Sequence, residues 1–204
     1  SVRQYGRGGK AGGQALPPMT LSYALKPQAD GDIDPEDSTN KKLQYPRLTR
    51  VDNGYGGMVE FTYQQKHYDH TYSYRVSERR QGDGMGQVSR VGYAYGGECY
   101  AYKNAVCNRV NSRNDALLGH NWAEETLYAF DGSVETKVRH HFHNDANQAT
   151  GREKKTEVKT PDGATILRET DNIWETDNSY GGNDDRYWSR LTQSKTCQEG
   201  VCTK

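Results

Sequence analysis

Long apolar runs are missing from this sequence of 204 residues, of which only 32% are hydrophobic and 26% are charged. No stretch approaches the roughly 18 to 20 apolar residues that a membrane-spanning helix requires, so no membrane span is expected. The first residues, SVRQYGRGGKAGG, also lack the apolar centre of a signal peptide. The sequence therefore predicts a protein without a membrane segment, whose start is a processed or trimmed end.

An excess of charge of either sign is missing as well. Lys and Arg together number 27, Asp and Glu together number 27, and the basic residues are scattered along the chain. Proteins that bind nucleic acid usually gather basic residues into a patch or stripe. Nucleic acid is therefore not an expected partner.

The motifs of common catalytic sites are absent too. The sequence contains no Gly-x-Ser-x-Gly elbow, no phosphate-binding loop and no His-Glu-x-x-His. Its acidic pairs, such as Glu124 with Glu125 and Asp184 with Asp185, are adjacent in the sequence, so on a strand the two side chains point to opposite faces. We expect a protein that is not an enzyme, with no catalytic residue and no cofactor.

Aromatic residues are plentiful, with 15 tyrosines and three tryptophans. Disordered chains are poor in such residues, so the low hydrophobic content does not indicate disorder here. Tyr and Trp can bury their rings and keep their polar atoms in water. The composition predicts a thin β-sheet protein with a small aromatic core.

The stretch YPRLTRVDNGYGGMVEFTY contains the clearest local signal. Asn53-Gly54 and Gly56-Gly57 tolerate the positive φ angles of a tight turn. Residues 58–63 then alternate as a half-buried strand does. Further hairpin signals are the Asp-Gly pairs at 131–132 and 162–163.

These patterns predict an all-β fold of consecutive antiparallel hairpins, in a curved or sandwich-like sheet with long loops and little helix. Only residues 115–127 show a weak helical pattern. We expect a flexible or partner-docking segment over 1–15, a β-hairpin domain over 16–177, and a C-terminal tail with a local disulfide over 178–204.

Four cysteines lie in two close pairs, and the simplest of the three pairings joins Cys99 to Cys107 and Cys197 to Cys202. Neither pair has the two-residue spacing of a zinc knuckle, so disulfides are preferred to a metal site. Disulfides form in oxidising compartments, which predicts an exported protein.

Two other features suggest metals, and for both we prefer a structural role. In RHHFHND, His141 and His143 point to one face of a strand, and His120 could join them as a ligand. The acidic loop at 30–37 resembles a calcium loop, but it has Pro35 where an EF-hand has its glycine. No metal site is predicted.

Several stretches, in this order, resemble the large secreted bacterial proteins of the Rhs/YD-repeat family, relatives of toxin-complex shell proteins and teneurins. They are LPPMTLSY, RLTRVDNGYGGMVEFTY, GHNWAEETLYAFDGSVETKVRHHFHND and GREKKTEVKTPDGATILRETDNIW. The resemblance covers about residues 16–176 and implies hairpins that wind into a shell or wall. The repeat is degenerate, because no Gly-Arg follows LYAFDGSVETK, and the family's self-cleavage motifs are absent.

The expected function is therefore assembly through β-strand edges into a shell, wall or surface filament, at the cell surface or outside the cell. Self-association is the expected partnership, with Tyr5, Tyr187 and Trp188 as assembly contacts. The alternative is a module that binds a polysaccharide by stacking sugar rings on exposed aromatic side chains, the candidates being Trp122, Trp174, Trp188, Tyr180 and Tyr187.

Overall fold

The computed structural model describes most of the strands and several of the turns between them, such as 53–57, 83–87, 129–133 and 160–165. The described residues are 16–27, 44–68, 71–102, 105–108, 116–143, 151–177, 188–199 and 201–203. None of them is in a helix, so this part of the chain contains no helix that could cross a bilayer.

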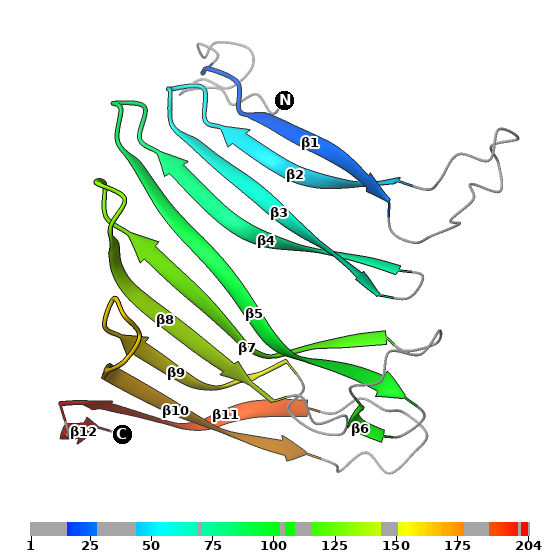
Figure 1. Cartoon of the computed structure of the whole chain (residues 1–204), viewed down its shortest axis with the longest axis vertical. Helices are drawn as coiled ribbons and strands as arrows, with labels where there is room; N and C mark the ends of the chain where they lie inside the picture. Colours follow the sequence, from blue (N-terminus) through cyan, green and yellow to red (C-terminus); the bar gives the residue numbers. More distant parts are fainter. Residues whose placement is uncertain are drawn as a thin grey trace, which may run out of the picture. The chain divides into compact units, whose positions relative to one another are not determined.

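The protein is all-β, as predicted, and its strands form one open antiparallel sheet (Figure 1). The order is β1-β2-β3-β4-β5-β7-β8-β9-β10-β11-β12, and β6 pairs with β5 outside this path. The strands are β1 (Thr20–Pro27), β2 (Gln44–Asp52), β3 (Met58–Tyr68), β4 (Thr71–Gly82), β5 (Val88–Tyr102), β6 (Ala105–Asn108), β7 (Ala116–Tyr128), β8 (Val134–Phe142), β9 (Glu153–Lys159), β10 (Ile166–Asp177), β11 (Trp188–Gln198) and β12 (Val201–Thr203).

Two sequence-based expectations differ from the structure. The described part of the weak helical pattern, residues 116–127, lies in β7, where Glu124 makes a cross-strand ion pair with Arg139. The expected C-terminal tail forms β11 and β12 in its described part, and β11 pairs with β10 from Asp177↔Trp188 to Arg168↔Gln198. Backbone pairing holds a strand in a sheet even when the strand has few apolar side chains, so low apolar content did not indicate a free tail.

The chain divides into two compact units. Unit 1 comprises Ser1–Gly92 and Tyr128–Ser133, and unit 2 comprises Tyr93–Leu127 and Val134–Lys204. Strand β5 contributes residues to both units. The predicted N-terminal segment 1–15 lies outside the described residues.

A conventional hydrophobic core is absent from the described part of the chain. Val91 is its one large hydrophobic residue with under a tenth of its surface exposed, at 8%. Glu157 and Lys159, at 8% and 9% exposure, are as deeply buried. The rings that we expected to form a compact core instead lie against individual strands.

Candidate assembly interface

Aromatic rings cover glycines of β5 in both units. In unit 1 a Cβ atom at Gly92 would lie 3.4 Å from the Tyr128 ring, and Arg90 stacks on the ring at 3.7 Å from its centroid. In unit 2 a Cβ atom at Gly96 would overlap the Trp122 indole, and the Arg139 guanidinium stacks on that indole at 4.5 Å from the ring centroid. Each ring therefore contacts both a glycine backbone and a guanidinium group, which cover part of the ring without a second sheet.

Replacing Gly96 by Ala should lower the free energy of unfolding by about 2 kcal/mol, because the new methyl group must displace the Trp122 ring. Tryptophan emission should change as the indole leaves its place under Arg139. The matched control is Gly92→Ala on the same strand, where the methyl group would make an ordinary contact with Tyr128. Equal denaturation midpoints for the two variants would contradict this packing account.

An ionic network occupies the sheet around β9 in unit 2. Glu157 Oε2 lies 2.8 Å from Lys159 Nζ and 3.2 Å from His141 Nε2, and Glu157 Oε1 lies 3.2 Å from Lys155 Nζ. Lys155 Nζ also lies 2.6 Å from Glu169, which stands opposite Glu157 in the register. One ammonium group thus bridges two carboxylates that would otherwise repel each other.

The two lysines and His141 change the acidity of Glu157. Burial raises the pKa of its carboxyl group, but the bonds from Lys159, His141 and Lys155 outweigh burial and lower the pKa to about 2. Salt bridges in water contribute little, whereas a buried carboxylate with two ammonium partners and an imidazole partner is costly to disturb. This network takes the place of an apolar core in this part of unit 2.

The turn predicted at residues 53–57 joins β2 to β3. Asn53 Oδ1 accepts hydrogen bonds from the amides of Tyr55 at 2.8 Å and Gly57 at 3.0 Å. Gly54 and Gly56 have φ angles of 79° and 91°. Gly57 does not have a positive φ angle. A Cβ atom at Gly57 would lie 2.5 Å from Asn53 Nδ2, so the Asn53 side chain leaves no room for a larger residue there.

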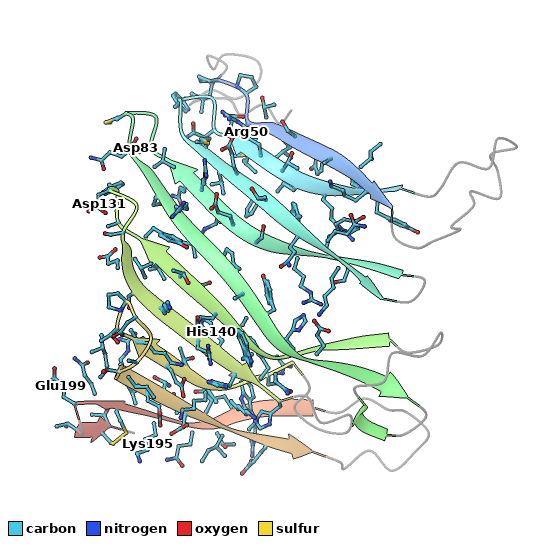
Figure 2. The ribbon with its side chains drawn as sticks, viewed as in Figure 1. Arg50, Asp83, Asp131, His140, Lys195 and Glu199 are labelled. Atoms are coloured by element: carbon cyan, nitrogen blue, oxygen red, sulfur yellow. A yellow bond between two sulfur atoms is a disulfide. The ribbon has the colours of Figure 1, made fainter. Side chains whose placement is uncertain are left out.

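A second turn of the same construction joins β4 to β5, thirty residues further on. Asp83 Oδ1 accepts hydrogen bonds from the amides of Met85 at 2.7 Å and Gln87 at 3.2 Å (Figure 2). Gly84 and Gly86 have φ angles of 82° and 99°. The glycines of QGDGMGQ, residues 81–87, predict a turn, but they do not by themselves reveal a repeat. The spacing Asn/Asp-Gly-x-Gly, which both turns share, could have indicated it.

These two turns stack on each other and on the segment before β1. A Cβ atom at Gly84 would lie 2.8 Å from the carbonyl carbon of Gly56, so the two glycine backbones are in direct contact. A Cβ atom at Gly54 would lie 2.6 Å from Pro17 Cβ. The LPP and NGYGG elements, far apart in the sequence, are therefore neighbours in unit 1.

Exposed large hydrophobic side chains occur in two places in the described part of the chain. One group lies at the turns or beside them: Leu16, Tyr55, Met85, Val88 and Phe130. The other group lies on the first two and last three strands of the order: Tyr23, Leu25, Tyr45, Ile166, Leu167, Ile173, Leu191 and Val201. Terminal strands also carry unpaired backbone groups along their outer edges. On β1, β11 and β12, exposed apolar side chains coincide with backbone edges that are unpaired in the described sheet, which makes these three strands the candidate interface.

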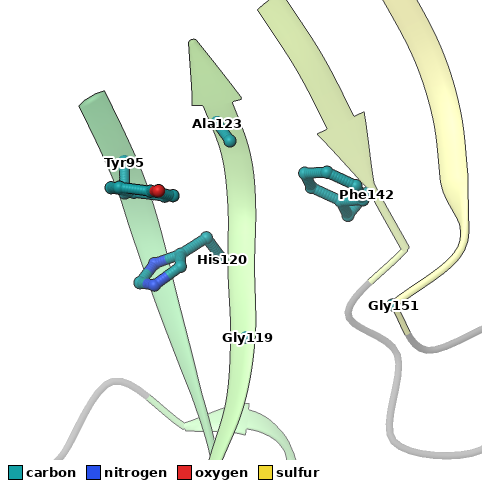
Figure 3. Close-up of a pocket in the computed structure, with 6 residues that line it drawn as sticks. All are labelled: Tyr95, Gly119, His120, Ala123, Phe142 and Gly151. Carbon is teal, nitrogen blue, oxygen red and sulfur yellow. The ribbon is translucent and has the colours of Figure 1, made fainter. Parts of the chain in front are cut away.

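Unit 2 also contains a hollow of about 240 Å³ (Figure 3). The Tyr95 and His120 rings lie on one side of it, with centroids 5.3 Å apart, and Phe142 lies across from them. Its lining residues are Tyr95, Gly119, His120, Ala123, Phe142 and Gly151. Sugar sites combine stacked rings with several convergent polar groups, and these six residues include no carboxylate, amide, ammonium or guanidinium side chain.

The described tryptophans named as sugar-stacking candidates are engaged within unit 2. Trp122 lies between Gly96 and Arg139, and Trp174 Nε1 donates a hydrogen bond of 2.7 Å to the Glu153 carbonyl. Tyr180 and Tyr187 lie outside the described residues, as do the assembly candidate Tyr5 and the side chain of Trp188.

Two histidines of RHHFHND, His140 and His141, lie beside carboxylates. His140 Nδ1 is 3.0 Å from Glu153, and His141 is in the Glu157 network. No group of three metal-ligating side chains occurs in the described ranges. The acidic loop at 30–37 lies outside them.

Of the predicted disulfides, Cys197 and Cys202 stand opposite each other in the β11–β12 pairing and are bonded. The side chains of Cys99 and Cys107 lie outside the described residues; their backbones belong to β5 and β6.

Comparison with known proteins gives structural neighbours only. No family model and no curated protein matches the sequence. The crystal structure of TcdB2-TccC3-Cdc42 is similar, with a TM-score of 0.55 and 8% identity over 89% of this chain. Structures of TcdB2-TccC3-TEV and of TcdB2-TccC3 without its hypervariable C-terminal region each give a TM-score of 0.54 at 10% identity.

This likeness shows the fold alone, because the identities are so low. It agrees with a toxin-complex-like β-sheet, the coarser part of the resemblance found in the sequence, and it does not identify a repeat family. The aligned region is 12% of the length of each of those chains. The same type of sheet thus occurs there within a much longer polypeptide.

Proposed function

We propose that this chain is a non-enzymatic structural protein, a length of β-hairpin wall that joins further strands through its edges, and that it works outside the cell or at its surface. The observation that carries this proposal is the position of the exposed apolar side chains. Within the described strands several of them lie on strands at the ends of the order, such as Leu25 on β1 at 63% exposure and Leu191 on β11 at 48%. A sheet that continued past β1 and β11 would place cross-strand neighbours beside these side chains and reduce their exposure.

Two further observations support the proposal. The described sheet buries very little apolar surface, so added strands would supply burial that the chain lacks alone. The Cys197–Cys202 disulfide suits an oxidising compartment. The similar structures contain this type of sheet within longer chains, which supports a role as a wall segment.

Light scattering over a range of concentrations tests the proposal. We expect reversible association of the chain, and we expect Leu25→Lys to weaken it about tenfold, or about 1.4 kcal/mol, because a charge on an edge strand opposes strand addition. Met85→Lys is the matched control: Met85 is 90% exposed but lies at a turn tip, so association should stay unchanged.

A chain that remains monomeric at every concentration would contradict the proposal. If such a monomer were retained on a polysaccharide column, the sugar-binding alternative would replace it. Equal effects of the two lysine variants would show that association uses general hydrophobicity rather than the β1 edge.

A further inference from the structure

Strand β12 is a three-residue strand on the outer side of β11. Its residues pair with 196–198 of β11, and all three are exposed, Val201 at 71%. A strand this short, with no buried side chain, is marginal by itself. The Cys197–Cys202 disulfide ties it to β11, because these two residues stand directly opposite each other.

The rest of the β11 outer edge pairs with no described strand. Three of the 11 residues of β11 pair with β12, and the other eight are residues 188–195. β1, whose outer edge is also unpaired in the described sheet, is eight residues long. The open part of one terminal edge thus equals the length of the other terminal strand.

The direction of the strands fits the same pairing. The order contains ten strands from β1 to β11, since β6 lies off the path. Neighbours in an antiparallel sheet alternate in direction, so the first and tenth strands run in opposite directions. A second copy added head to tail would therefore place its β1 antiparallel to β11 and continue the alternation.

We propose that β12 is a stop that fixes the register of strand addition: β1 of a second copy pairs with residues 188–195 of β11, and the disulfide-bonded β12 blocks residues 196–198. The inference rests on the proposed function, because it names the partner strand for assembly through edges. When all eight residues of β1 pair against this stop, Leu25 of one copy lies opposite Arg190 of the other. Figure 2 labels Lys195 and Glu199 on the β11–β12 hairpin, where the stop lies.

The test is photo-cross-linking of the full chain with a benzophenone amino acid at position 25, followed by mass spectrometry of the cross-linked peptides. We expect cross-links to residues 189–191 of a second copy. In Cys197→Ser/Cys202→Ser the stop is released, so the cross-links should spread along β11, and amides 196–198 should exchange about tenfold faster at low concentration.

The control is Glu199→Gly, which removes a non-glycine residue with a φ of 50° and leaves the disulfide in place. Its cross-links should match those of the unsubstituted chain. Cross-links spread along β11 before the cysteines are replaced, or located on other strands, would overturn the stop while leaving assembly intact. Absence of association in all variants would overturn the proposed function and this inference together.

Discussion

Replacement of Gly54 by Ala is expected to lower the free energy of unfolding by about 3 kcal/mol. Two costs combine at this position. A residue with a side chain strains the backbone at a φ of 79°, and its Cβ atom would lie 2.6 Å from Pro17 Cβ and 2.9 Å from the Pro18 carbonyl oxygen. The stacking of the turn on the LPP segment must then open.

Gly86→Ala separates the two costs. Gly86 has a φ of 99° but no neighbour within 4 Å of its Cβ position, so only the backbone strain of about 1 kcal/mol should appear. Denaturant unfolding followed by far-ultraviolet circular dichroism is the measurement, because all three tryptophans lie in the sequence of unit 2 and would report poorly on unit 1. Equal losses for the two variants would show that contact with Pro17 contributes nothing.

Replacement of Glu157 by Gln should also cost about 3 kcal/mol at neutral pH, because the ammonium groups of Lys155 and Lys159 lose their shared carboxylate. The unsubstituted protein should lose this contribution in acid. The carboxyl group has a pKa of about 2 when folded and an ordinary value of 4.5, so its stabilisation is fully present above pH 4.5 and disappears as the pH falls toward 2.

Urea unfolding of the unsubstituted protein and of Glu157→Gln across that pH range is the measurement. The stability difference between them should shrink steadily as the pH falls. Glu175→Gln is the control: Glu175 pairs with Arg190 at 2.8 Å, but their side chains are 60% and 81% exposed, so the loss should be under about 0.5 kcal/mol. A constant difference between the Glu157→Gln and unsubstituted proteins would contradict the assignment of this pKa.

Local chemistry made the hairpins predictable. Asn53-Gly54 indicated the first turn because the side-chain oxygen and the backbone freedom it needs are properties of those residues alone. The Asp-Gly pairs at 131–132 and 162–163 are at turns in the same way. Hydrogen bonds from the Ser133 side chain and amide hold the pKa of the Asp131 carboxyl group below its ordinary range. Hydrogen bonds from the Thr160 hydroxyl and the Ala164 amide do the same to the pKa of Asp162.

Contacts that depend on cross-strand register were beyond the sequence. REKKTEVKT looks like ordinary solvated charge, and nothing within it reveals that His141 and Glu169 stand beside Glu157. The place of Trp122 on Gly96 depends equally on how β5 lies against β7. Counting aromatic residues suggested a compact core, whereas the Tyr128 and Trp122 rings lie on glycines of β5 and beside arginines.

The strand order has a consequence for how this protein folds. Almost every strand pairs with the strand before it and the strand after it in the sequence, so closing each hairpin fixes only a short loop. Structure can therefore propagate one hairpin at a time from any point of nucleation, much as in repeat proteins. A chain of this kind can acquire its structure progressively as it emerges from a ribosome or a secretion pore, without waiting for distant residues.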